Sequence, residues 1–120
     1  EKENFIATRK GVLNPNTLSK EERIQLIKEK PEYGNIICRC EMITEGEIID
    51  AIRRPLGAKS LDGVKRRTRA GMGRCQGGFC SPQVVRIIAE FLGVPLSAVR
   101  KSSADAPITF GPTKSGEVQA

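Results

Sequence analysis

The clearest pattern of apolar and polar residues lies near residues 81–93. Counting from Val84, apolar side chains follow the i, i+3, i+4, i+7 and i+8 spacing of one buried helix face. They are Val84, Ile87, Ile88, Phe91 and Leu92. Ser81 is a suitable N-cap, Pro82 suits the first helical position, and Gly93 suits a C-terminal stop. The pattern therefore predicts a helix beginning at Ser81 and ending at Gly93, with those five residues in the core.

Two earlier helices are predicted from capping boxes, in which a hydroxyl residue is followed three positions later by glutamate. Ser19 with Glu22 opens one helix, and Thr44 with Glu47 opens the other. Short apolar stripes follow each box, at Ile24 and Ile27, and at Ile48, Ile49 and Ile52. Proline and glycine end the two segments, at Pro31 and Gly34, and at Pro55 and Gly57.

A third, basic helix is predicted from Ser60, with Leu61, Val64 and Thr68 on its apolar side. Gly71 or Gly73 should end it. No pair of strands and no internal repeat is evident. The expected fold class is therefore all-α, a small helix-turn-helix pair arrangement with a four-cysteine cluster site between two loops.

Chain organisation is predicted from composition. Residues 1–17 are polar and contain NPN, so they are interpreted as an N-terminal arm or linker. Residues 18–101 hold the helices and form the predicted domain, with one more turn at 97–101. Residues 102–120 mix Ser, Pro, Gly and Ala and are expected to form a flexible C-terminal tail, in which 108–110 could pack as an extended piece.

The chain of 120 residues has few large core side chains, with no tryptophan, one tyrosine and four phenylalanines. Such a small domain gains much from a metal or disulfide staple. No segment approaches the ~20 apolar residues that cross a bilayer, and no signal-peptide pattern is present. We therefore expect a reducing, cytoplasmic location, where thiols bind metals more often than they pair.

All four cysteines fall in two tight pairs, and the chain contains no histidine. Cys38 and Cys40 are separated by one residue, and Cys75 and Cys80 by four. Four thiols from two distant segments predict a four-coordinate sulfur site. The missing histidine excludes mixed Cys/His zinc fingers, a Rieske centre and a His-based catalytic triad.

Spacing leaves three readings of the cysteines open. They are a 2Fe-2S cluster, a structural zinc site, and disulfides or free thiols. Zinc usually has two to four residues between paired cysteines, so Cys38 and Cys40 can share a site only if the backbone bends between them. Both pairs precede predicted helix N-termini, where unpaired N–H groups and the dipole favour thiolates and an anionic cluster.

The net charge of +6 is concentrated between Arg53 and Arg74, where eight basic residues accompany a single acid, Asp62. A solvated helix face is the ordinary explanation of such a run. One functional explanation is charge compensation for an anionic cluster or attraction of an acidic redox partner, with Arg39, Arg69 and Arg74 nearest the cysteines. The rival is a zinc-stapled basic helical module that binds nucleic acid. Few aromatic residues are available to stack on bases, so no nucleic-acid partner is expected.

The cysteine motifs and their surroundings resemble the 2Fe-2S domain related to bacterioferritin-associated ferredoxin. The similarity covers roughly residues 18–93, and it rests on CRCE, on TEGEI, and on LDGVKRRTRAGMGRCQGGFC. The four-residue spacing of the second pair resembles the version of this domain at the C-terminus of anaerobic-type, FAD-dependent glycerol-3-phosphate dehydrogenases. Related domains occur in amino-acid, opine and sarcosine oxidases.

The resemblance implies that Cys38, Cys40, Cys75 and Cys80 hold a 2Fe-2S cluster, although a recombinant sample could carry zinc instead. It implies a parent oxidoreductase whose FAD domain precedes Glu1, so the fragment alone is not expected to be an enzyme. The implied function is relay of electrons from reduced flavin to an acceptor protein or a quinone-linked subunit. Through such subunits the domain would lie at the inner face of the membrane.

Overall fold

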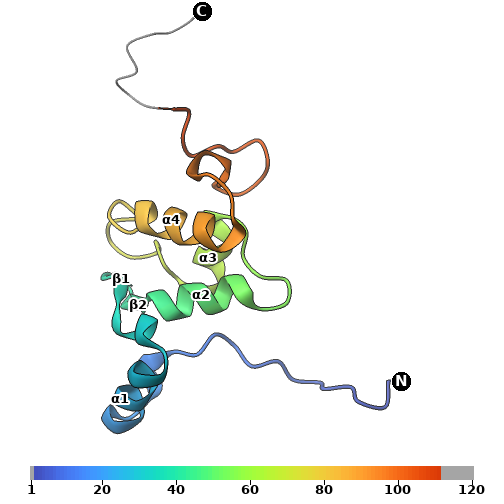
Figure 1. Cartoon of the computed structure of the whole chain (residues 1–120), viewed down its shortest axis with the longest axis vertical. Coiled ribbons are helices and arrows are strands. Elements are labelled where there is room, and N and C mark those ends of the chain that lie inside the picture. The colour runs from blue at the N-terminus through green and yellow to red at the C-terminus, as the bar shows by residue number, and fades with distance from the viewer. Residues whose placement is uncertain (1, 112–120) are drawn as a thin grey trace, which may run out of the picture.

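The computed structural model describes residues 2–111, and four helices form most of its regular structure (Figure 1). In chain order the helices and strands are α1 (Lys20–Glu29), β1 (Ile36–Cys38), β2 (Ile43–Thr44), α2 (Glu45–Arg53), α3 (Leu61–Thr68) and α4 (Ser81–Leu92). Single 3-10 turns lie at Pro15–Thr17, Pro31–Gly34 and Leu96–Ala98.

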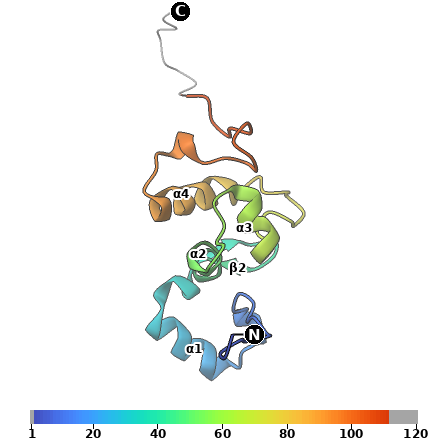
Figure 2. The same ribbon diagram turned by 90° about the vertical axis from the view of Figure 1, so that its right-hand side faces the viewer.

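Helices α2, α3 and α4 pack around one apolar core, while α1 lies outside it (Figures 1 and 2). Ile48 and Ile88 are fully buried at its centre, together with Val64 from α3. Helix α1 has no buried residue and rests against the Pro31–Gly34 turn. The turn itself is anchored by buried Tyr33, whose ring occupies the space that a side chain at Gly46 of α2 would need.

Both predicted capping boxes are confirmed. The Ser19 hydroxyl accepts a hydrogen bond from the Glu22 backbone N–H, and the Glu22 carboxylate accepts one from the Ser19 N–H. Thr44 and Glu47 make the same reciprocal pair at α2, in a buried setting. Ser60 caps α3 by accepting from the Gly63 N–H. Local hydrogen bonds of this kind explain why the starts of these three helices are readable from sequence.

The expectation of an all-α fold is wrong, because β1 and β2 pair as a small antiparallel sheet. Ile36 lies opposite Thr44, and Cys38 lies opposite Ile43, with an irregularity between Ile36 and Cys38. The chain reverses between the strands with Met42 in the left-handed region, at φ 55°. Strands of three and two residues are too short to display the period-two alternation by which a strand is recognised.

The expected site between two loops also needs correction. Cys38 is the last residue of β1, and Cys80 is the N-cap of α4, so only Cys40 and Cys75 lie in loops. Ser81 is therefore the first residue of α4 and not its cap, and Cys80 makes no side-chain capping hydrogen bond. Pro82, at the second helical position, favours the start of α4 even though no side chain caps it.

Two further helix predictions are wrong in detail. Helix α3 ends at Thr68 with Arg69 as its left-handed C-cap, before either predicted glycine. In α4, Phe91 and Leu92 are each 38% exposed and do not belong to the core. The last turn of α4 carries them past the buried cluster, and the Arg53 guanidinium lies 4.7 Å from the Phe91 ring centroid. Periodicity identified the correct face, but the neighbouring helices determine how far that face is covered.

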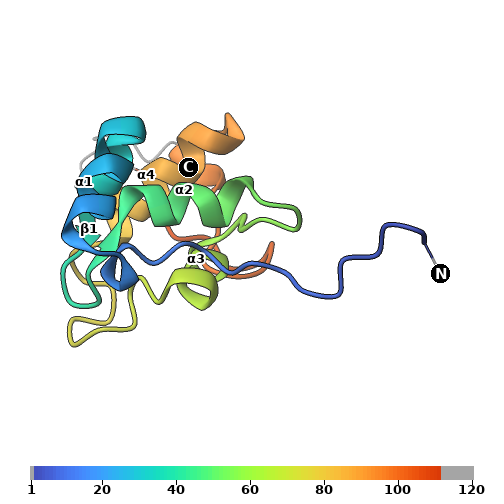
Figure 3. The same ribbon diagram turned by 90° about the horizontal axis from the view of Figure 1, so that it is seen from below.

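The segments outside the helices make specific contacts with the core domain. Arg9 donates to the Pro55 carbonyl over 2.8 Å, which ties the N-terminal arm to the end of α2 (Figure 3). After the 3-10 turn, Arg100 forms backbone bridges to Ser60 and Pro107. Of the predicted tail 102–120, residues 112–120 lie outside the described part. Within residues 2–111, no helix has both the length and the apolar run that crossing a membrane requires.

Candidate metal centre

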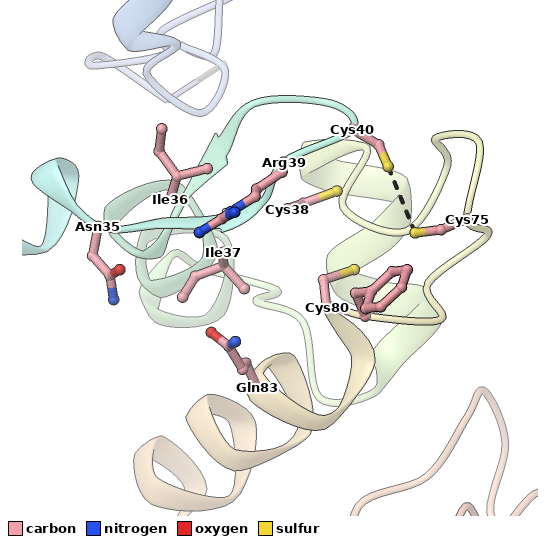
Figure 4. A pocket seen from close by; sticks show the side chains of 10 residues that line it. Asn35, Ile36, Ile37, Cys38, Arg39, Cys40, Cys75, Cys80 and Gln83 are labelled. Atoms are coloured by element: carbon pink, nitrogen blue, oxygen red, sulfur yellow. Dashed lines mark hydrogen bonds between the residues drawn. The ribbon is translucent and has the colours of Figure 1, made fainter.

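All four cysteines line one cavity of about 580 Å³, although they come from segments 35 residues or more apart (Figure 4). The other lining residues are Asn35, Ile36, Ile37, Arg39, Phe79 and Gln83. The cavity lies where β1, the loop after α3 and the first turn of α4 meet. Thiol groups are the only metal-ligating side chains in its lining.

The structure pairs the cysteines across the two motifs and not within them. The Cys40 thiol donates to the Cys75 sulfur over 3.6 Å. After burial, the neighbouring thiol of Cys38 contributes most to the raised pKa of Cys80. Cys38 and Cys80 are buried, whereas Cys40 is exposed and Cys75 half-buried. None of the four forms a disulfide. The site therefore has a buried half and an open half, each with one sulfur from each motif.

Backbone position explains how Cys-x-Cys reaches one cavity. The Cys38 side chain projects from the end of β1, and the reversal toward Met42 then brings Cys40 to the same cavity. The bend that the single-residue spacing required is thus present. Cys80 lies at the N-terminus of α4 as expected, but Cys40 does not lie at a helix N-terminus, because β2 separates it from α2.

The loop between α3 and α4 needs glycine at two positions. A Cβ at Gly73 would lie 2.1 Å from the Cys40 Cβ, so only glycine allows the two motifs to approach this closely. Gly77 has φ +82°, and a Cβ there would also lie 2.6 Å from the Ser81 hydroxyl oxygen. Gly77 lies in the part of the loop whose backbone N–H groups act on the Cys75 thiol.

The two halves of the site perturb their thiols in opposite directions. The pKa of Cys75 is lowered, first by a hydrogen bond from the Phe79 backbone N–H and then by the Cys40 thiol, with smaller help from the Gly77 and Gly78 N–H groups. Burial, followed by the Cys38 thiol, raises the pKa of Cys80 to about 11. Amides aimed at a sulfur favour its thiolate, whereas an apolar surrounding favours the protonated thiol.

The basic block between Arg53 and Arg74 does not form a single face on the cysteines. Arg67 donates to the carbonyl oxygens of Gly63 and Leu56, and Arg53 lies over Phe91. Arg69 is neutralised by Glu41 over 2.8 Å. Two exposed arginines beside the cysteines have no ion pair among the described residues. They are Arg39, which lines the cavity, and Arg74, which directly precedes Cys75.

Sequence reasoning did not assign a role to Phe79 or Gln83, although both line the cavity. Phe79 is 85% exposed. The available signal was a large apolar residue directly before a cysteine and outside every predicted helix. Gln83 gave no signal beyond its position one turn into α4.

The donor set fits a cluster with two iron ions better than a single metal ion. Structural zinc needs four ligands around one ion. A 2Fe-2S cluster instead divides four cysteines between two irons, so it requires two pairs, and two pairs are what this cavity presents.

We expect Gly73→Ala to destabilise the fold by about 1–3 kcal/mol, because the added methyl overlaps the Cys40 side chain and the loop must shift. Urea unfolding would measure the free energy. Gly11→Ala is the matched control, since a Cβ there meets nothing within 4 Å. Equal stability of the two variants would show that the motifs are not in the close contact described.

Comparison with known proteins identifies the kind of site. The family described as BFD-like 2Fe-2S binding domain matches residues 36–90, a range that includes all four cysteines. Neither this family nor the relatives support zinc. No solved structure matches the chain.

Three relatives are informative. A glycerol 3-phosphate dehydrogenase of Caloramator mitchellensis is 53% identical over 119 residues, 99% of this chain and 25% of the relative. Hydrogen cyanide synthase subunit HcnB of Pseudomonas aeruginosa is 47% identical over 62 residues, 48% of this chain and 13% of the relative. One subunit of the anaerobic glycerol-3-phosphate dehydrogenase of Escherichia coli K12 is 39% identical over 59 residues, 49% of this chain and 11% of the relative.

The chain therefore spans a quarter or less of the length of these relatives. Its similarity to the Caloramator mitchellensis protein includes both the cysteine segments and the flanking arm and tail. Its similarity to the other two is confined to about half the chain. Together with the convergence of four thiols on one cavity, the match over residues 36–90 shows that this part of the chain belongs to the family of BFD-like 2Fe-2S binding domains.

Proposed function

We propose that Cys38, Cys40, Cys75 and Cys80 hold a 2Fe-2S cluster and that the chain relays electrons within a dehydrogenase. The observation that carries this proposal is the meeting of all four thiols at one cavity as two cross-motif pairs. When bound, such a cluster accepts and donates single electrons. No other group with redox chemistry lines the cavity.

The chain's own residues have three tasks in this proposal. The thiolates bind iron, and the N–H groups of Phe79, Gly77 and Gly78 stabilise negative charge on Cys75. Arg39 and Arg74 offset the charge of an anionic cluster. Burial of Cys38 and Cys80 keeps water from one side of the site, whereas the side of Cys40 stays open. Electrons would therefore enter and leave at the open side.

The parent protein is proposed to be an FAD-dependent glycerol-3-phosphate dehydrogenase. Support comes from the relative in Caloramator mitchellensis, to which 99% of the chain aligns. A similar segment also occurs in a protein named as a hydrogen cyanide synthase subunit, which is not a glycerol-3-phosphate dehydrogenase by name. In this proposal an FAD domain outside the chain supplies electrons, and a protein or quinone-linked subunit receives them at the cytoplasmic face of the membrane. The chain itself does not oxidise the substrate.

The test is anaerobic purification of the chain, followed by metal and sulfide analysis. We expect iron and acid-labile sulfide in about a two-to-two ratio per chain, with visible absorption that dithionite bleaches. Adding photoreduced FAD should bleach the same absorption, because reduced flavin is the proposed donor. A colourless protein with one zinc per chain would contradict the cluster. An intact cluster that reduced FAD leaves unchanged would contradict the relay.

A further inference from the structure

Phe79 is a large apolar side chain that contributes nothing to the core. It is 85% exposed, yet it lies in the loop between Cys75 and Cys80 and lines the cysteine cavity. Exposed aromatic residues on a rigid support are typical anchors of protein interfaces. We propose that Phe79, Arg39 and Arg74, here called the cysteine rim, form the docking surface for a separate electron-transfer protein whose contact face is apolar at its centre and acidic around it.

The backbone holds Phe79 in place before any partner arrives. The residue after it, Cys80, is the buried N-cap of α4. The Gly78 N–H donates to the Cys75 carbonyl over 3.0 Å, which closes a tight turn just before the phenylalanine. The backbone at this residue is therefore ordered before docking, which reduces the conformational entropy that binding costs.

Charge determines which partner fits. The ten residues that line the cavity include Arg39 but no acid. Arg74, which is exposed and directly precedes Cys75, adds a second cation next to the lining. The nearest acid in the first motif, Glu41, is already paired with Arg69. With a net charge of +6, the chain stays positive after binding an anionic cluster. Acidic protein surfaces are therefore attracted, and basic ones are repelled.

The composition of the cysteine rim, one exposed aromatic ring and two exposed cations, favours a transient partner over a permanent neighbour. Obligate interfaces are large and hydrophobic, whereas brief redox encounters use small contacts with a charged margin. Charge steering speeds the encounter of separate molecules, but a tethered domain already has a high effective concentration. Docking on the ring brings the partner within one residue of Cys80, and short distance is what electron transfer requires.

The docking surface rests on the proposed function, and electron transfer to a defined probe tests it. The cluster-loaded chain is reduced with dithionite and mixed with ferric cytochrome b5, an acidic haem protein, in a stopped-flow instrument. Each event oxidises the cluster by one electron and reduces one ferric haem to ferrous, with no proton transferred. Rates are normalised to iron content and are also measured with p-benzoquinone, a small neutral acceptor.

Phe79→Ala should lower the ratio of the cytochrome rate to the quinone rate about tenfold, while Phe79→Leu should restore much of it. Arg39→Gln and Arg74→Gln should each lower the same ratio about threefold at low salt and flatten the dependence of the cytochrome rate on salt. Phe110→Ala and Lys28→Gln are matched controls. Phe110 is 93% exposed in the C-terminal segment, and Lys28 is exposed on α1.

The outcomes separate the docking surface from the function. If the iron content and the bleaching by reduced FAD are normal but Phe79→Ala leaves the ratio unchanged, the docking surface is wrong and the relay stands. Faster transfer to basic cytochrome c than to cytochrome b5, after allowing for driving force, would overturn the charge assignment. A chain that binds no iron overturns both.

Discussion

Replacing any one of Cys38, Cys40, Cys75 and Cys80 with alanine is expected to abolish the iron–sulfur absorption and most of the bound iron. Each thiol is one of only two sulfurs in its half of the cavity, and no histidine or carboxylate in the lining can replace it. With a ligand removed, one iron would keep a single protein ligand. Iron and sulfide assays on the anaerobically purified variants measure the loss.

Ser102→Ala is a suitable control, since it removes one polar atom from an exposed residue outside the cavity. The buried and exposed ligands should differ in a second respect. Cys38→Ala and Cys80→Ala also leave gaps in the core cluster to which both residues belong, so these variants should unfold at lower urea than Cys40→Ala. A variant that keeps full iron and an unchanged spectrum removes that residue from the ligand set.

Removing the cluster is expected to lower the melting temperature by at least about 10 °C. A loss of only ~2 kcal/mol shifts the midpoint of a domain this small by roughly that amount, and ligands that bind only the folded state contribute more. The loop from Gly71 to Phe79 contains no helix or strand, and its one cysteine, Cys75, contacts Cys40 of the first motif. Thermal unfolding of the loaded protein and of chelator-treated protein, followed by circular dichroism, measures the difference.

Hydrogen exchange adds a local test of the same prediction. After iron is removed, amides of β1 and of the loop before Cys80 should lose protection, whereas those of α2 around Ile48 should keep most of theirs. Ile48 is fully buried among α3 and α4 and needs no metal to remain so. Identical melting temperatures with and without iron would mean that the helices alone stabilise the fold.

The correct predictions concern features fixed by residues close together in the sequence, and the wrong ones concern features fixed by contacts between distant segments. The starts of α1, α2 and α3 were predicted because each depends on a cap and residues within one turn of it. The pair β1 and β2 was missed because its two short segments become strands only by bonding to each other. Phe91 was wrongly assigned to the core because its burial depends on where the neighbouring helices end. The spacing of apolar residues along α4 carries no information about those ends.

At the site, the sequence predicted which residue types bind the metal, but not which of these residues lie next to each other. Cysteine count, spacing and the missing histidine already pointed to thiolate chemistry. The sequence presented Cys38 with Cys40 and Cys75 with Cys80, whereas the fold pairs Cys40 with Cys75 and places Cys38 beside Cys80. The basic residues between Arg53 and Arg74 likewise make separate contacts, and Arg69 forms an ion pair with Glu41 of the first motif.

The sequence by itself therefore determined the helix starts, the ligand chemistry and the positive charge, because each is a property of single residues or of neighbours within one turn. Only the tertiary structure decided which sulfurs face each other, which arginines remain unpaired among the described residues, and that Phe79 stays outside the core. These depend on contacts between segments tens of residues apart. Packing of α2, α3 and α4, and the absence of a side chain at Gly73, bring those segments together.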